Sequence, residues 1–280
     1  MHKMIAFALG LLPFWAASSA ANGKEVCASN TLCIETVRRG NVIDFFAINK
    51  KVGLPISGKV SLTLKNMRVI NGKNDPFVLA GSERRKLFAL RVPERGAWKY
   101  NYRFSWARGD FTAKQDTSYA YRLPYAKGTA FRISQGCNGK FSHFGSQRYA
   151  VDFSMKIGTP IHAARGGIVV DVKEDSNKGG PSRRFREEAN VVSIQHDDRT
   201  LGMYFHLKQN GAAVEIGDRV KAGDLIGYSG NTGFSSGPHL HFAVTKANKS
   251  ISEEISLPIF FQTRLGQLRC PNPGTRLVAQ

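Results

Sequence analysis

The sequence predicts a mainly β protein with two domains: a small β-sandwich-like domain, followed by a domain built on an antiparallel sheet. Short apolar runs alternate with polar residues at period two, most clearly in Val60-Ser61-Leu62-Thr63-Leu64, as half-buried strands do. Turn signals such as Asn71-Gly72 and Gly109-Asp110 separate these runs at short intervals. Several short strands with turns at this spacing are typical of a β-sandwich.

Residues 1–21 have the composition of a secretory signal peptide. Lys3 supplies a positive charge, Met4 to Trp15 is almost entirely apolar, and residues 16–21 are all alanine or serine, which suits a signal-peptidase site. A membrane anchor is the alternative, but the apolar run is shorter than the roughly 20 residues that span a bilayer. We expect a protein secreted across the inner membrane, with no transmembrane segment after signal removal. Its expected location is the periplasm, with the extracellular space as the alternative.

The first predicted domain, residues 22–122, contains most of the alternating runs. Val42-Ile43, Phe77-Val78-Leu79 and the aromatic series Tyr100, Tyr102 and Phe104 are among its expected strands. It contains no constellation of catalytic side chains. We expect this domain to position substrate, to cover the catalytic groove as an inhibitory segment, or to bind a partner.

The second predicted domain, residues 123–280, follows a linker and differs from the first in the pattern of its turn-forming residues. Gly158-Thr159-Pro160 opens a run from Ile161 to Val170, and strands are expected at Val191 to Ile194 and Met203 to Leu207. Glycines recur between them, as expected at the sharp bends of a tightly coiled antiparallel sheet. The polar, charged segment Lys173 to Asn190 is interpreted as a long surface loop.

The chain is strongly basic, with a formal net charge of +19 over 280 residues. A basic surface attracts anionic polymers and speeds encounter with them. Because the chain is expected to be exported, we expect anionic cell-wall or envelope polymers as partners and no nucleic acid. Solubility alone explains part of the charge.

Four cysteines, Cys27, Cys33, Cys137 and Cys270, follow the predicted signal peptide. An even number of cysteines in an oxidising compartment indicates two disulfides, and four cysteines allow three connectivities. We favour a local Cys27–Cys33 bridge together with a long-range Cys137–Cys270 bridge. Zinc ligation by Cys137 is the competing interpretation, and the absence of any CxxC pair argues against it.

Two histidines, His239 and His241, are separated by one residue in an apolar, strand-like run. Residues i and i+2 of a strand point to the same face, so the two imidazoles are expected side by side. Asp152 and His206 also interrupt apolar runs. A polar set of this kind on hydrophobic strands suits one metal ion and a catalytic base, and predicts a zinc hydrolase.

Six motifs, ordered along residues 135–245, resemble the lysostaphin/LytM-type zinc metallopeptidases of the M23 family. They are Ser142-His143-Phe144-Gly145, Tyr149-Ala150-Val151-Asp152-Phe153, Gly158-Thr159-Pro160-Ile161, Gly166-Gly167-Ile168-Val169, Tyr204-Phe205-His206-Leu207 and the run from Ser229 to Phe242. The resemblance implies an M23-type antiparallel catalytic domain that binds one Zn²⁺ per chain and acts on peptidoglycan.

The resemblance also implies the site residues. Asp152 and His241 match two zinc ligands, and His143 is the candidate for the third; His206 and His239 match two catalytic histidines that do not bind the metal. Many family members carry the first ligand four residues before the aspartate, where this chain has Arg148. His143 lies nine residues before Asp152, which resembles a family variant with a longer turn.

The chemistry of these residue types agrees with this assignment. Catalytic zinc takes three protein ligands and keeps one position open for water. A nearby imidazole can take a proton from that water at working pH. We assign this role of general base to His239 and expect His206 to orient water or stabilise an oxyanion, although these two roles are exchangeable. Tyr204 is either a further hydrogen-bond donor or a packing residue.

The predicted function is an exported zinc endopeptidase that hydrolyses peptide cross-links of bacterial peptidoglycan. One alternative is a catalytically silent M23-like module that binds cell wall and activates another wall hydrolase. The complete set of candidate ligands argues against this alternative. A second alternative is a metallopeptidase that acts on secreted proteins.

Overall fold

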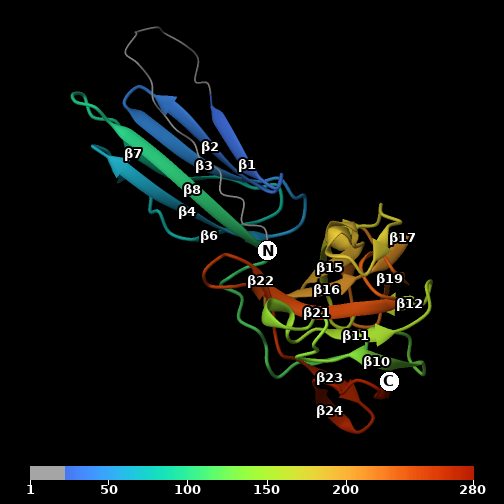
Figure 1. Cartoon of the computed structure of the whole chain (residues 1–280). Coiled ribbons are helices and arrows are strands. Elements are labelled where there is room, and N and C mark those ends of the chain that lie inside the picture. Colours follow the sequence, from blue (N-terminus) through green and yellow to red (C-terminus); the bar gives the residue numbers. More distant parts are fainter. Residues whose placement is uncertain (1–22) are drawn as a thin grey trace. The chain divides into compact units, whose positions relative to one another are not determined.

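The computed structural model describes residues 23–280, so the predicted signal peptide lies outside the described residues. The described chain divides into two units, residues 23–111 with Ala247–Glu253, and Thr112–Lys246 with Glu254–Gln280. Strands dominate both units (Figure 1). The mainly β, antiparallel fold class is therefore confirmed, whereas the predicted domain boundaries remain a prediction. Among the described residues, no helix has the length and hydropathy that a transmembrane span requires.

The first unit consists of two antiparallel sheets. The larger has the order β1-β2-β3-β7-β5, with β1 at Lys24–Ala28, β2 at Leu32–Arg39, β3 at Val42–Asn49, β7 at Arg84–Arg91 and β5 at Arg68–Ile70. The smaller has the order β6-β4-β8, with β6 at Phe77–Leu79, β4 at Ile56–Lys65 and β8 at Lys99–Arg108. Side chains of both sheets, including Phe45, Phe88, Val60 and Phe104, form one hydrophobic core.

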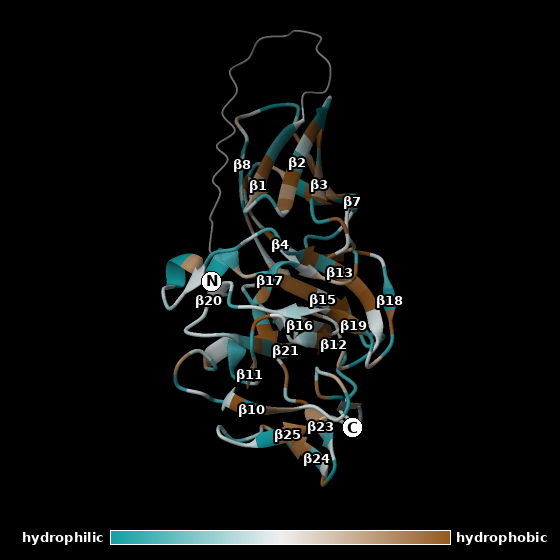
Figure 2. Cartoon of the chain, turned by 90° about the vertical axis from the view of Figure 1, so that its right-hand side faces the viewer, coloured by the Kyte–Doolittle hydropathy of each residue, from teal (hydrophilic) through white to brown (hydrophobic). Residues whose placement is uncertain are grey.

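The second unit is organised around a nine-stranded sheet with the order β18-β13-β15-β16-β21-β11-β10-β25, and β22 pairs with β21 at its side. These strands are β10 (Ala130–Gln135), β11 (Val151–Ser154), β13 (Gly167–Lys173), β15 (Val191–Gln195), β16 (Leu201–Phe205), β18 (Arg219–Val220), β21 (His239–Ala247), β22 (Glu254–Ser256) and β25 (Arg276–Val278). Apolar residues give β13 and β15 their brown colour in Figure 2.

Three small sheets accompany the main sheet. They are β12-β19-β17, β24-β23-β9 and the two-stranded β14-β20, built from β9 (Ala120–Tyr121), β12 (Pro160–His162), β14 (Gly179–Gly180), β17 (Leu207–Ala212), β19 (Leu225–Ser229), β20 (Gly233–Phe234), β23 (Phe260–Thr263) and β24 (Gly266–Arg269). Two 3₁₀ helices, η1 (Gly145–Gln147) and η2 (Arg183–Glu188), complete the unit. The segment expected to be only a surface loop therefore also contains β14 and η2.

Both predicted disulfides are present. Cys27 is bonded to Cys33 and Cys137 to Cys270, which excludes Cys137 as a thiolate ligand for zinc. Glu25 lies close to the first pair, but disulfide-bonded sulfurs are not thiolates and do not form a metal site with it.

A buried ion pair stabilises the hairpin between β15 and β16. Arg165 Nη1 donates to Asp198 Oδ2 at 2.6 Å and to the Tyr121 hydroxyl at 3.2 Å. Burial alone would raise the pKa of Asp198, but hydrogen bonds from the Asp116 N–H and from Thr200, together with Arg165, lower it to about 2. Because the pKa is lower in the folded chain, charged Asp198 stabilises the fold above the carboxyl's unfolded value of about 4.

We therefore expect Asp198→Asn to lower the free energy of unfolding at pH 7 by about 1–2 kcal/mol. The difference from the wild type should shrink as the pH falls from about 4 towards 2, where the wild-type carboxyl also becomes protonated. Urea denaturation at several pH values measures this difference. Asp197→Asn, at an exposed neighbouring position, is the matched control. A pH-independent effect of Asp198→Asn would contradict the prediction.

Candidate active site

Four neighbouring strands of the main sheet place polar and aromatic side chains along one row. Gln135 of β10 is paired with Asp152 of β11, Asp152 with His241 of β21, and His241 with Phe205 of β16. Residues directly opposite each other on adjacent strands share a face of the sheet. Gln135, Asp152 and His241 are therefore brought together although they are far apart in the sequence.

Period-two alternation explains why these side chains leave the core. Leu240 and Phe242 of β21 are buried in the hydrophobic core, so His239 and His241 lie on the opposite face of the strand. Val151 and Phe153, the neighbours of Asp152 on β11, are also buried in the core, so the Asp152 side chain lies on the opposite face of its strand. The apolar neighbours thus fix which side chains face the site.

His143 reaches the site from the loop between β10 and β11. Its side chain is fully buried, and its Nδ1–H donates to the carbonyl oxygen of Gly136 at 2.9 Å. This hydrogen bond leaves the Nε2 lone pair free to bind a metal. Nε2 lies 3.1 Å from Asp152 Oδ1 and 3.3 Å from His241 Nδ1.

The donor set His143, Asp152 and His241 fits a zinc ion. His241 Nδ1 lies 2.9 Å from Asp152 Oδ1, so the three potential ligand atoms are 2.9, 3.1 and 3.3 Å apart. Ligand atoms of a tetrahedral zinc site with bonds of about 2.0 Å are separated by about 3.3 Å. One carboxylate and two neutral imidazoles are also the ligand types that zinc prefers.

The remaining two histidines lie beside this donor set. The ring centroids of His206 and His239 are 4.6 Å apart, and His239 Nε2 is 3.7 Å from Asp152 Oδ1. His206 follows the end of β16 with a φ of +67°, a conformation that is uncommon and costly outside glycine. Its Nδ1–H donates to the carbonyl of Thr232 at 2.6 Å, which fixes the ring in the site.

Burial and the cluster of imidazoles set the ionisation of the site. Burial, reinforced by the nearby His239 and His241, lowers the pKa of His206 to about 3. Burial also lowers the pKa of His241, against the opposing effect of Asp152. Burial disfavours the charged form of Asp152, but its close interactions with His143 and His241 outweigh burial and hold the pKa of the carboxyl well below the usual value. A charged Asp152 carboxylate beside the neutral imidazole of His241 is the arrangement that binds a cation.

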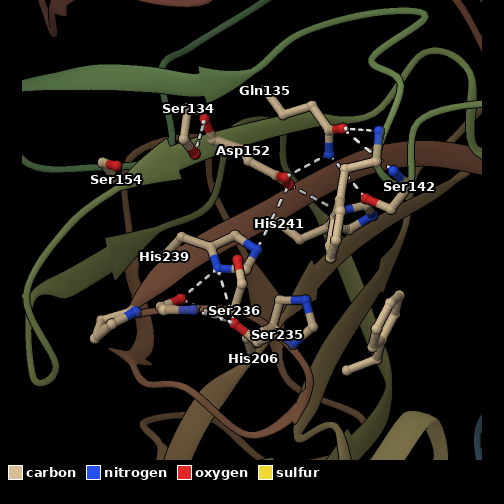
Figure 3. Close-up of a pocket in the computed structure, with 14 residues that line it drawn as sticks. Ser134, Gln135, Ser142, Asp152, Ser154, His206, Ser235, Ser236, His239 and His241 are labelled. Atoms are coloured by element: carbon tan, nitrogen blue, oxygen red, sulfur yellow. Dashed lines mark hydrogen bonds and ion pairs between the residues drawn. The ribbon is translucent and has the colours of Figure 1, made fainter. Parts of the chain in front are cut away.

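Asp152, His206, His239 and His241 line a pocket of about 340 Å³, and the fully buried His143 contacts it through Asp152. Figure 3 shows Gln135 and Ser142 on the opposite side of Asp152 from His239 and His206. The other residues that line the pocket are largely hydroxyl-bearing or aromatic: Ser134, Phe141, Ser154, Phe234, Ser235, Ser236, Gly237 and Pro238. Phe141 and Phe234 stack with their ring centroids 5.5 Å apart, so the pocket offers a polar floor and an apolar wall.

The five predicted site residues lie together, in or directly beside this pocket: His143, Asp152, His206, His239 and His241. Tyr204 lies elsewhere, in the hydrophobic core. The Tyr204 ring is fully buried in the core and its hydroxyl accepts a hydrogen bond from the Ala164 N–H at 2.7 Å, so it is a packing residue. Sequence reasoning missed Gln135, whose amide Nε2 donates to Asp152 Oδ2 at 3.0 Å. The sequence carries no motif for it, and only its register opposite Asp152 reveals the contact.

Comparisons with known proteins place this site in a family. Residues 146–253 match the model of peptidase family M23, a segment that includes Asp152, His206, His239 and His241 and begins after His143. Lysostaphin of Staphylococcus simulans is 42% identical over 98 residues, covering 35% of this chain and 18% of its own length. Peptidoglycan DD-endopeptidase ShyA of Vibrio cholerae is 32% identical over 132 residues, covering 46% and 28%.

Among solved structures, the catalytic domain of lysostaphin from Staphylococcus simulans is 30% identical, with a TM-score of 0.29; the match covers 51% of this chain and 92% of that one. This chain spans less than a third of the length of lysostaphin and of ShyA. The match to the family model includes most of the residues that line the pocket. Residues 146–253 are thereby identified as a peptidase family M23 domain within the chain.

Proposed function

We propose that this chain is an exported, zinc-dependent endopeptidase that hydrolyses peptide cross-links of bacterial peptidoglycan. The observation that carries this proposal is the convergence of His143, Asp152 and His241 on one point, beside two further histidines in an open pocket. The relatives named lysostaphin and peptidoglycan DD-endopeptidase ShyA support it.

The metal would be held by His143 Nε2, Asp152 Oδ1 and His241 Nδ1. When bound there, zinc supplies Lewis acidity, which polarises a carbonyl group and acidifies water. Asp152 binds through Oδ1 because Oδ2 accepts the hydrogen bond from Gln135. With three protein ligands, the site keeps room for water and substrate, as catalytic zinc sites do.

His239 is assigned as the general base. Its Nδ1–H donates to the Gly237 carbonyl at 2.8 Å, and the Ser235 hydroxyl lies 3.2 Å from the same nitrogen. These contacts leave the lone pair on Nε2, which lies on the Asp152 side of the ring. A neutral imidazole held in this tautomer accepts a proton from water and passes it to the leaving amine.

His206 is assigned as the residue that orients the attacking water. Because its Nδ1–H is committed to Thr232, the other ring nitrogen carries a lone pair and acts as an acceptor. Its burial keeps the ring neutral. Stabilising an oxyanion would require a proton on this nitrogen, so the contacts favour orientation of water.

The substrate is proposed from the relatives and the expected compartment. An exported chain with disulfides fits a periplasmic location, where the proposed scissile bond joins D-alanine to diaminopimelate. The polar floor of the pocket offers hydrogen bonds to a peptide backbone, and Phe141 and Phe234 offer apolar contacts. The first unit is proposed to position the substrate, inhibit the site or bind a partner.

Digestion of purified sacculi tests the proposal. The chain without residues 1–21, loaded with zinc, should release muropeptides with cut cross-links, and a glycine-rich protein should be cut more slowly. A chelator should abolish the release, and zinc should restore it. Cleavage of the protein alone would indicate a peptidase of secreted proteins. Binding to sacculi by the zinc-loaded chain without any cleavage would indicate the silent module.

The net charge of +19 leads to a separate prediction about retention on the wall. His239→Ala, which should not digest the wall, is expected to cosediment with sacculi at low salt and to detach as salt is raised. Salt at about 0.15 M already limits charge interactions to about 8 Å. Measuring the bound fraction against salt concentration checks this. Binding that is insensitive to salt would contradict a role for the basic surface.

A further inference from the structure

The loop that carries His143 is held by a short segment at the end of β10. Residues 136–150 connect β10 to β11. Residues 138–150 of this connection, the ligand loop, contain η1 as their only 3₁₀ helix among the described residues. Ordering an irregular loop costs conformational entropy. Three consecutive residues precede the ligand loop: Gln135, Gly136 and Cys137. Each of them contacts the loop, contacts a proposed metal ligand, or links this segment to the rest of the unit.

The amide of Gln135 connects the ligand loop to Asp152. Its Oε1 accepts the backbone N–H groups of Phe141 at 3.0 Å and Ser142 at 3.2 Å. These two donors determine the orientation of the amide, so that Nε2 donates to Asp152 Oδ2 at 3.0 Å and to the Ser142 hydroxyl at 2.8 Å. Gln135 thereby leaves Asp152 Oδ1 to face His143 and His241.

The next two residues hold His143 from the other side. The Gly136 carbonyl accepts the His143 Nδ1–H, and Cys137 is bonded to Cys270 near the end of the chain. Gly136 is packed so closely that a Cβ on it would lie 2.2 Å from the Pro271 carbonyl oxygen. The C-terminal segment therefore fixes the position of the carbonyl that orients the metal ligand.

We propose that Gln135 and the Cys137–Cys270 disulfide form a positioning clamp for the metal centre. Neither supplies a ligand atom. Together they hold His143 and Asp152 in the ligating arrangement before metal arrives, and so raise the affinity for zinc. The clamp compensates for the long separation of His143 from Asp152 in the sequence. This inference rests on the proposed function, in which His143, Asp152 and His241 bind zinc.

The Gln135 half of the clamp is tested with Gln135→Leu, which keeps the bulk of the side chain and removes its hydrogen bonds. The matched control is Gln115→Leu, which removes a hydrogen bond to the Pro258 carbonyl at 2.7 Å in the same unit. Competition with a chromophoric chelator should show zinc bound about 10–100-fold more weakly by Gln135→Leu than by the control. The visible spectrum of the Co²⁺-substituted chain should change in Gln135→Leu alone.

The disulfide half is tested with the double variant Cys137→Ser/Cys270→Ser. The control is Cys27→Ser/Cys33→Ser, which removes the disulfide of the first unit. Zinc affinity should fall, and transfer of zinc to the chelator should accelerate, in the first double variant only. Unfolding of both variants in the presence of chelator separates lost stability from lost affinity. If the serine variants do not fold, zinc transfer from the folded wild type before and after mild reduction gives the same comparison.

The outcomes separate the clamp from the proposed function. Zinc affinity and Co²⁺ spectra equal to those of the matched controls, in a wild type that binds zinc, would overturn the clamp and leave the metal site intact. Failure of the wild type itself to bind zinc would overturn the proposed function. A selective loss of affinity in both tests would establish Gln135 and the disulfide as positioning elements.

Discussion

Replacing His241 by alanine is expected to abolish both zinc binding and endopeptidase activity. His241 supplies one of three converging ligand atoms, with Nδ1 2.9 Å from Asp152 Oδ1. Its removal leaves one imidazole and one carboxylate, too few protein ligands for a catalytic zinc site. Zinc content by atomic absorption should fall from one ion per chain to near zero, and release of muropeptides should fall to background.

A control is needed because a histidine variant can also perturb the fold. His162→Ala removes a histidine of the same unit whose Nδ1–H donates to the Gly223 carbonyl at 2.8 Å and which does not line the pocket. It should retain full zinc content and activity. In the presence of chelator, His241→Ala and the wild type should unfold at similar temperatures, because the wild type then also lacks the ion. Stoichiometric zinc in His241→Ala would contradict the ligand assignment.

Replacing His239 by alanine is expected to leave zinc bound while turnover falls by about 10²–10⁴-fold, the usual contribution of a general base. His239 lies beside the donor set, with Nε2 3.7 Å from Asp152 Oδ1, but it supplies none of the three converging ligand atoms. The value of kcat should fall much more than KM rises, because proton transfer is lost and substrate contacts remain. Zinc content and steady-state kinetics on a cross-linked muropeptide measure the two effects.

The comparison with His206→Ala decides how the two histidines share the work. Both variants should retain zinc, and added imidazole should restore turnover in the variant that has lost the general base, which we expect to be His239→Ala. Rescue of His206→Ala alone would exchange the two roles. Equal loss of zinc from both variants would overturn the division between metal ligands and catalytic histidines.

The strand-borne part of the site could be predicted because burial constrains it. Leu240 and Phe242 must face the core, so period-two alternation places His239 and His241 together on the other face. Val151 and Phe153 also face the core, so the same alternation places the Asp152 side chain on the face of the sheet that carries the site. Sequence alone is sufficient here because the pattern of apolar neighbours leaves only one orientation for the strand.

The loop-borne part could not be derived in this way. The position of His143 depends on backbone carbonyls, on the amide of Gln135 and on a disulfide to Cys270. The two hydrogen bonds join residues six and seven positions apart, the disulfide joins residues 133 positions apart, and none of these contacts has a periodic signal. His206 likewise depends on a φ of +67° and on the Thr232 carbonyl, neither of which its neighbours in the sequence indicate.

The segment from Lys173 to Asn190 contains further structure that could not be predicted from the sequence. Its polar composition predicts a surface loop, and η2 lies within it with its residues exposed or partly exposed. The parallel pairing of Gly179 and Gly180 with Gly233 and Phe234 has no alternating apolar pattern to announce it. A Cβ on Gly179 would lie 1.9 Å from the Asn231 carbonyl oxygen, so the close approach of the two chains requires glycine there.

The most direct test of the account is the zinc content and sacculus cleavage of the wild type and of His143→Ala, measured on the same preparations. His143 lies outside the segment that matches the family model, so its role as the third ligand rests on the geometry of this chain. One zinc ion per chain and cut cross-links are expected in the wild type, with both lost in His143→Ala. A His143→Ala variant that keeps its zinc and cleaves sacculi at the wild-type rate would contradict the assignment of His143 as the third ligand.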